Sequence, residues 1–437
     1  MTKDMKYKMV ALPLLCAALL LSGCSAPSEK EASEANQAAS SKMQGSDAEA
    51  SGGENGTESG KTLTAEDLAK VPVLGQGRNV KGADGKTYYT NSVEFYDTFD
   101  TVVQFTAYTK DEAEFQKWYE LLHEEFQRLH RLYDNFHTYE GIVSLLSVNQ
   151  DAAKHPVKLD PDLFDLLKFS VDNYEKTLKK VNIAMGAPLM LWTNAREAAA
   201  EAKEAEEHAE AASGSGSGSA PLEEKETPPE GKLPDAAALQ EAGKHMHLSD
   251  VMLNEKDHTV QFQDAQLKLD AGAVAKGFAT ELVAKKLEAA GLEHGLIAAG
   301  GNVRLIGTPV DGDPTWTVGI THPRPEQGTM IAKVEAPGEM SMVTSGDYQR
   351  YFMVDGVRYH HIIDPSTLQP GRLWSSVTVR TPDSGLADLL STAFFLSTKE
   401  EAQKIIAQFP GTPIDVLWVD TDMNVSMTEG MKAEIIK

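Results

Sequence analysis

Two long stretches of this 437-residue chain are too poor in large apolar side chains to form a core. Residues 25–60 are mainly Ser, Ala, Glu and Gly, and residues 197–231 pass from an Ala/Glu/Lys run through alternating Ser and Gly to a Pro/Glu stretch. Such segments cannot offset the entropy lost on ordering. We expect a disordered tether over residues 24–62. We interpret residues 197–231 as a low-complexity loop insertion, with a linker between domains as the alternative.

The N-terminus has the features of a secretion signal. Three lysines within the first eight residues precede an apolar run, Met9 to Leu21, which is too short to span a bilayer comfortably. The run leads into the tetrapeptide LSGC, ending at Cys24, which resembles the bacterial lipobox. We therefore expect residues 1–23 to be a signal peptide and Cys24 to carry lipid, giving an extracytoplasmic protein anchored to the bacterial cell membrane. An ordinary signal peptide with an incidental Cys, or an uncleaved anchor, is the alternative.

Charge and cysteine content exclude several classes of protein. The net charge of −24 disfavours binding to nucleic acid, because phosphate backbones would be repelled. The only other cysteine, Cys16, lies in the segment that cleavage would remove. A disulfide framework, a Cys-rich metal site and cysteine catalysis are therefore excluded for the mature chain.

The rest of the chain, residues 63–437, has the patterns of one globular domain of mixed type. Val93–Tyr108 is rich in β-branched and aromatic residues, as strands are. Residues 111–133, 161–178, 276–290 and 387–396 have helical character, and Asp355-Gly356 between two strand-like runs indicates a hairpin. Strands outnumber helices and several adjoin through turns, which predicts an α+β fold with mixed, largely antiparallel sheets packed with helices.

Three segments carry residues suited to chemistry. In the first, Asp270 and Lys276 flank small residues where a strand leads into a helix, so Asp270 is a candidate helix cap; a plain turn with a solvent-facing lysine is the alternative. In the second, His360, His361 and Asp364 offer a general base, a phosphate contact or metal ligands. In the third, Asp388 and Thr392 share one helix face.

The oxygen pair of Asp388 and Thr392 suits Mg²⁺, which keeps waters and accepts substrate phosphate as a ligand. A capping Asp and a buried Thr form the alternative interpretation of this pair.

The order and spacing of these segments resemble the ApbE family, the FAD:protein FMN transferases. The shared motifs are Asp-x-x-Ala-x-x-Lys-Gly at Asp270–Gly277, Gly-Gly-Asn at Gly300–Asn302, Ser-Gly-x-Tyr at Ser345–Tyr348, His-Ile-x-Asp-Pro at His361–Pro365 and Ala-Asp-x-x-Ser-Thr at Ala387–Thr392. The resemblance runs from about residue 93 to 429, apart from residues 197–231. It implies an ApbE-like, T-fold-like architecture.

The resemblance also implies a reaction and a set of site residues. Mg²⁺ held by the Ala273 carbonyl, Asp388 and Thr392 would assist transfer of FMN from FAD, the substrate, to a Thr or Ser hydroxyl of an acceptor flavoprotein, with release of AMP. His361 and Asp364 are the expected catalytic residues. The expected flavin-nucleotide contacts are Tyr139, Lys180, Val181, Asn182, Asp270, Lys276 and Ile362. A Mg²⁺-dependent FAD pyrophosphatase and a non-catalytic flavin-binding lipoprotein remain as alternatives.

Overall fold

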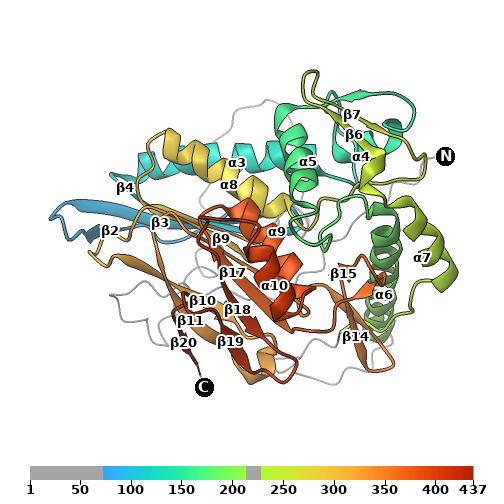
Figure 1. Cartoon of the computed structure of the whole chain (residues 1–437). Coiled ribbons are helices and arrows are strands. Elements are labelled where there is room, and N and C mark those ends of the chain that lie inside the picture. Colours follow the sequence, from blue (N-terminus) through green and yellow to red (C-terminus); the bar gives the residue numbers. More distant parts are fainter. Residues whose placement is uncertain (1–71, 213–227, 437) are drawn as a thin grey trace, which may run out of the picture.

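The computed structural model describes residues 72–212 and 228–436 (Figure 1). The predicted signal peptide, Cys24 and the tether at residues 24–62 lie outside the described residues. Within the described ranges, no helix combines the length and the apolar character needed to cross a membrane.

The strands, in chain order, are β1 (Val73–Leu74), β2 (Arg78–Lys81), β3 (Thr87–Thr98), β4 (Thr101–Thr109), β5 (Val157–Lys158), β6 (Val251–Asn254), β7 (Thr259–Phe262), β8 (Gly295–Ala299), β9 (Asn302–Ile306), β10 (Thr315–Thr321), β11 (Met330–Pro337), β12 (Ser341–Gly346), β13 (Tyr351–Val354), β14 (Val357–His360), β15 (Ile363–Asp364), β16 (Gln369–Pro370), β17 (Ser376–Thr381), β18 (Asp415–Val419), β19 (Val425–Met427) and β20 (Ala433–Ile435). The α-helices are α3 (Glu112–Tyr133), α4 (Leu145–Asp151), α5 (Pro161–Asn173), α6 (Gly186–Ala212), α7 (Ala236–Ala242), α8 (Ala275–Ala289), α9 (Ser384–Phe395) and α10 (Lys399–Ile406).

A ten-stranded antiparallel sheet is the centre of the fold. Its order is β1-β3-β4-β8-β9-β12-β17-β18-β19, with β2 paired to β3. Helices α3, α8 and α9 cover one face, and the small sheet β10-β11-β20 covers the other (Figure 1). The α+β, largely antiparallel prediction is therefore confirmed.

Alternation along the strands assigns side chains to the two faces of this sheet. Ile297 of β8 and Val343 of β12 join the core under the helices, whereas their neighbours Leu296 and Met342 join the core under the small sheet. Both faces are buried, so these strands are apolar on both sides. The helices thereby acquire a rigid support, and the motif residues at their N-terminal ends are held in place.

The apolar run Val93–Tyr108, expected as strand, is a hairpin made of β3 and β4. The chain reverses at Phe99 and Asp100, whose φ angles of 54° and 48° lie in the left-handed region. Neither residue is glycine or asparagine, the usual signals of such a turn, so no local pattern indicates the reversal.

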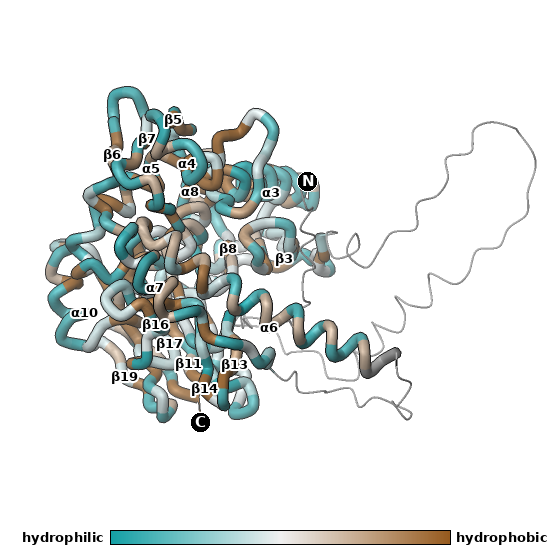
Figure 2. Tube along the Cα trace, turned by 90° about the vertical axis from the view of Figure 1, so that its right-hand side faces the viewer, coloured by the Kyte–Doolittle hydropathy of each residue, from teal (hydrophilic) through white to brown (hydrophobic). Residues whose placement is uncertain are grey.

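The expected loop at residues 197–231 is only partly a loop. Residues 197–212 continue α6, which extends away from the body of the molecule (Figure 2). Ala199 on this helix is buried against the β13–β14 hairpin. The Gly231 amide donates to the Met353 carbonyl of that hairpin, and the Met353 amide donates to the Pro229 carbonyl. The interpretation that nothing in this segment faces a core is therefore wrong for residues around 199 and 231. An alanine can pack closely without creating an apolar stripe in the sequence.

Candidate functional site

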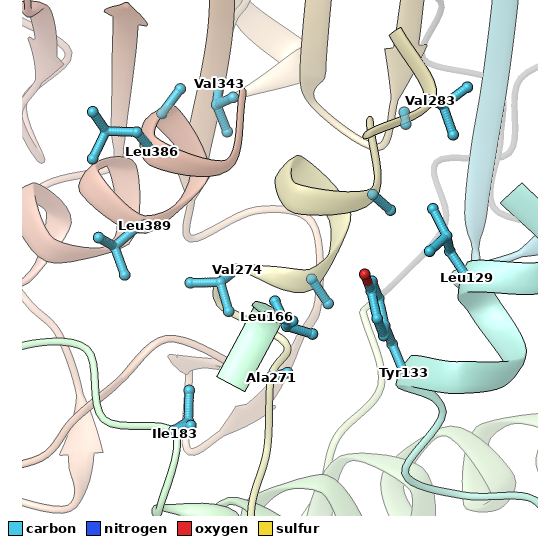
Figure 3. Close-up of a cluster of buried hydrophobic side chains, with 14 of the residues drawn as sticks. Leu129, Tyr133, Leu166, Ile183, Ala271, Val274, Val283, Val343, Leu386 and Leu389 are labelled. Carbon is cyan, nitrogen blue, oxygen red and sulfur yellow. The ribbon is translucent and has the colours of Figure 1, made fainter. Parts of the chain in front are cut away.

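The loop that leads into α8 packs on the main hydrophobic core. Its residues Ala271 and Val274 are buried there, and the close-up shows both beside Leu166 and Ile183 (Figure 3). The preceding residue Leu269 is held by Asn149, whose Oδ1 accepts from the Leu269 amide at 2.7 Å. The loop backbone therefore has little freedom, and the residues between these anchors face outward in a defined order.

Asp270 does not cap α8, contrary to the expectation. The helix N-cap is Val274, which offers no side-chain cap, and the Asp270 carboxylate instead accepts from the Gly272 amide at 2.8 Å. Burial raises the pKa of Asp270, while the Gly272 hydrogen bond, Arg196 and Lys276 act in the opposite direction. Asp270 therefore shapes the loop and lies among the cations of the site.

Helices α8 and α9 meet at Gly277 and Asp388. The Gly277 amide donates to Asp388 Oδ2 at 2.8 Å. A Cβ on Gly277 would lie 2.3 Å from the Ser384 carbonyl oxygen and 2.4 Å from Asp388 Cβ, so only glycine allows this approach. The Lys-Gly pair of the motif thus has a structural reason: glycine brings the Asp388 carboxylate against the first turn of α8.

The contact satisfies one of the first amides of α8. Because Val274 is the N-cap, the Gly277 amide, at the third helical position, has no acceptor within the helix. It donates to Asp388, and among the described residues no backbone amide donates to the carbonyl of Ala273, which precedes the N-cap. The loop before α8 therefore offers a carbonyl without a backbone donor, four residues before the amide that holds the buried carboxylate.

The Asp388 side chain is 4% exposed and is not a helix cap, since Asp383 caps α9 through the Leu386 amide. Burial raises the pKa of Asp388, and the charge of Lys276 acts to lower it. Apart from Gly277, no group in the described residues donates to this carboxylate. A buried carboxylate with so little compensation calls for a cation.

Thr392 lies one turn after Asp388, and its hydroxyl is 3.4 Å from Ser345 Oγ. Ser345, from the Ser-Gly-x-Tyr motif on β12, is also 2.8 Å from Ser391 Oγ. Carboxylate, hydroxyl and free carbonyl are the hard oxygen ligands that Mg²⁺ prefers, with phosphate and water completing its shell. The described residues hold no group of three or more His, Cys, Asp or Glu side chains suited to a metal, so a metal here would depend on the substrate for further ligands.

The two neighbouring histidines have different surroundings. His360 is buried; its Nε2 donates to the Gly371 carbonyl at 2.8 Å and its Nδ1 accepts from the Ile362 amide at 3.2 Å. Burial lowers the pKa of His360 to about 4. His360 is therefore a neutral residue that holds the turn before Gly371.

His361 is the histidine that is available for chemistry. Its Nδ1 lies 3.3 Å from the Arg350 carbonyl, which can only accept, so Nδ1 carries the hydrogen and Nε2 keeps its lone pair. Burial, followed by the charges of Arg350 and Arg196, holds the pKa of His361 well below its usual range. His361 is thus a neutral imidazole with one free basic nitrogen.

The other expected site residues make mainly structural contacts. Asp364 accepts from the Ser366 amide and hydroxyl at 2.8 and 2.6 Å, and its other oxygen is 3.7 Å from Lys180 Nζ. Asn182 uses both ends of its amide on backbone groups, the Ala184 amide and the Met246 carbonyl. These contacts give Asp364 and Asn182 the role of shaping loops, and a catalytic role of Asp364 stays a prediction.

The remaining residues expected to contact the flavin nucleotide differ in which of their groups can reach a ligand. The Tyr139 hydroxyl donates to Asp134 Oδ2 at 2.5 Å, and burial, followed by this hydrogen bond, raises the pKa of Tyr139. Val181 and Ile362 are buried, so only their backbone groups can reach a ligand. Arg196 and Arg350, which act electrostatically on both Asp270 and His361, were missed from the sequence. Arg196 immediately precedes the Ala/Glu/Lys run that begins at residue 197, and no local pattern distinguishes it from the charged residues of that run.

Comparison with known proteins gives a consistent result. The model of the ApbE family matches residues 99–416. A protein of Treponema pallidum named FAD:protein FMN transferase is 32% identical over 302 residues, covering 66% of this chain and 74% of that protein. A protein of the same name from Klebsiella pneumoniae is 28% identical over 289 residues, covering 66% of this chain and 77% of its own length.

Solved structures show the same fold. The crystal structure of the ApbE protein of Thermotoga maritima has a TM-score of 0.62 at 26% identity, with 81% of this chain and 97% of that chain covered. The flavin transferase ApbE of Vibrio cholerae has a TM-score of 0.59 at 21% identity, with 81% and 97% covered.

Proposed function

The chain belongs to the ApbE family, and from this premise we propose that it transfers FMN from FAD to a Thr or Ser hydroxyl of an acceptor protein, with Mg²⁺ as cofactor and AMP as the second product. Its relatives are FAD:protein FMN transferases, and this chain is an enzyme of that kind. The observation that supports the detailed reaction best is the buried Asp388 carboxylate, for which the Gly277 amide is the one donor among the described residues.

Asp388, Thr392 and the Ala273 carbonyl are the groups that would hold Mg²⁺. Their fit rests on the chemistry of the donors and on the uncompensated carboxylate. When bound, Mg²⁺ supplies positive charge against the diphosphate of FAD and the departing AMP.

The protein's own residues account for the remaining needs of the reaction. Lys276 acts electrostatically on Asp388, Asp270 and His361, which supports a role for its ammonium group in neutralising phosphate oxygens. The free Nε2 of His361 accepts the proton of the acceptor hydroxyl. The hydroxyl oxygen then bonds to the phosphorus on the FMN side, the bond from that phosphorus to the bridging oxygen breaks, and AMP leaves with the bridging oxygen.

We also propose that Cys24 is lipidated and that the enzyme acts on an acceptor outside the cytoplasm, at the membrane surface. The lipobox-like tetrapeptide supports this location. A membrane anchor would restrict the acceptor to proteins that reach the same surface.

The test is incubation of the protein with FAD, Mg²⁺ and a candidate acceptor, followed by detection of flavin fluorescence on a denaturing gel and of released AMP. We expect flavin to stay attached to the acceptor and AMP to appear in equal amount. AMP release without attached flavin would identify a pyrophosphatase, with water in place of the hydroxyl. Flavin binding without AMP release would identify a binding protein. Either result would contradict the proposal.

A further inference from the structure

Arg196 lies on the face of α6 that packs against the β13–β14 hairpin. Trp192, one turn earlier, stacks on Tyr359 with ring centroids 5.9 Å apart. Ala199, almost one turn later, is buried in the same small core as Phe352. Positions i, i+4 and i+7 of a helix share a face, so Arg196 is directed toward the hairpin between these two contacts.

Groups of the active site lie at the open end of this hairpin, where β13 begins and β14 ends. Arg350 immediately precedes β13 and His361 immediately follows β14, and the His361 amide donates to the Arg350 carbonyl at 3.1 Å. Arg350 Nη2 also donates to the Asp100 carbonyl in the β3–β4 turn at 3.0 Å. Arg196 and Arg350 therefore reach the surroundings of His361 from two directions, one from α6 and one from the hairpin itself.

Arg196 has no contacting partner in the described part of the chain. Its guanidinium makes no hydrogen bond and no ion pair there, although it has five donors. Burial and the charge of Arg350 lower the pKa of Arg196, and the charges of Glu197, Asp100 and Asp270 act in the opposite direction without contacting it. The nearby carboxylate of Asp270 already accepts from Gly272. Two guanidinium groups held near each other, one of them without a partner, form a site for an anion.

We propose that Arg196 binds the FMN-side phosphate of FAD. This inference rests on the proposed function, since it assigns a binding residue to that reaction. Arg196 acts electrostatically on His361, and His361 serves the hydroxyl that attacks the FMN-side phosphorus, so of the two phosphates of FAD we assign this one to Arg196. The planar guanidinium can donate two parallel hydrogen bonds to phosphate oxygens, which the compact ammonium of lysine cannot do.

The experiment compares the affinities of three flavins for the full mature chain, by flavin fluorescence without added Mg²⁺ so that no turnover occurs. In Arg196→Gln we expect the affinities for FAD and FMN to fall roughly 10-fold to 100-fold, the range for loss of charged hydrogen bonds. Riboflavin, which has no phosphate, should bind as tightly as to the wild type. Arg196→Lys should give an intermediate loss.

The matched control is Lys203→Gln, which removes the same charge from the same helix face two turns further out, where Lys203 pairs with Glu207 at 3.4 Å. It should change none of the three affinities. Thermal unfolding of the ligand-free proteins separates binding from folding: because Arg196 has no partner, Arg196→Gln should unfold at the wild-type temperature or above.

Each other outcome has a defined meaning. Unchanged FAD and FMN affinity in Arg196→Gln would overturn the inference, and so would an equal loss of riboflavin affinity or a fall in unfolding temperature. If the wild type transfers FMN to an acceptor while Arg196→Gln binds FAD normally, only this inference is wrong. If the wild type binds neither FAD nor FMN, the proposed function fails and the inference fails with it.

Discussion

Replacement of Gly277 by alanine should separate the two helices that form the site. The new Cβ would lie 2.3 Å from the Ser384 carbonyl oxygen and 2.4 Å from Asp388 Cβ, more than 1 Å inside ordinary contact. Both atoms belong to the backbone of α9 or lie directly on it, so no side-chain rotation relieves the clash. Overpacking of this kind costs about 1–3 kcal/mol of stability.

The same shift should also weaken catalysis. It removes the 2.8 Å hydrogen bond from the Gly277 amide to Asp388, which fixes the carboxylate. Loss of a hydrogen bond to a charged group is worth about 1.5–3 kcal/mol, so FMN transfer should fall roughly 10-fold to 100-fold. Urea unfolding measures the first effect, and the initial rate of acceptor labelling at saturating FAD measures the second.

Gly385→Ala is the matched control at the same helix interface. Its Cβ would lie 3.2 Å from Asp383 Oδ1 and 3.3 Å from Phe278 Cα, which a small adjustment accommodates. It should lose little stability and little activity. If Gly277→Ala labels the acceptor as fast as Gly385→Ala does, the approach of α8 to Asp388 does not matter for transfer.

The remaining predictions concern the two histidines, residues 201–231 and Cys24. His361→Gln should reduce transfer at least 10-fold and remove the acid limb of the activity–pH profile, which in the wild type should lie below pH 6.5 because the pKa of His361 is lowered; rates between pH 5 and 8 check this. The pKa of His360 is lowered to about 4, so between pH 6.5 and 4 the unfolded chain takes up a proton that the folded chain does not. The free energy of unfolding should therefore fall by up to roughly 3 kcal/mol over this range. Urea titrations should show a smaller fall in His360→Gln. Deletion of residues 201–231 should lower the unfolding temperature, since it removes the hydrogen bonds of 2.8 and 2.9 Å that residues 229 and 231 share with Met353; an unchanged temperature would show that these contacts contribute nothing. Cys24→Ser should release active enzyme from the membrane fraction, and membrane association of the variant would identify the apolar run as the anchor.

The chemistry of the site could be predicted from the sequence because it depends on fixed short spacings. Asp388 and Thr392 share a helix face wherever the helix lies, and the Lys276-Gly277 pair marks a close approach of backbone to a neighbour. What the sequence could not show is the identity of that neighbour. Only the structure reveals that it is Asp388, and that among the described residues no backbone amide donates to the Ala273 carbonyl.

The failures have a common physical origin in contacts between distant segments. Aspartate is a common helix cap, but α8 begins five residues after Asp270, and Asp270 stabilises the loop instead. Ala199 lies in a run that looks fully solvated, yet the β13–β14 hairpin covers it. Arg196 is an active-site candidate only because α6 continues past Trp192 and lies on that hairpin. Local patterns contain none of this information.

The Mg²⁺ dependence of FMN transfer in Asp388→Asn tests most directly whether Asp388 holds the metal. Asparagine keeps the shape, and its carbonyl can still accept from the Gly277 amide, so FAD binding should persist. Without the carboxylate charge, the developing phosphoryl charge loses several kcal/mol of stabilisation. We expect a loss of transfer of about 100-fold or more, with rates that rise only at high Mg²⁺. Transfer at the wild-type rate at low Mg²⁺ would show that Asp388 does not hold the metal.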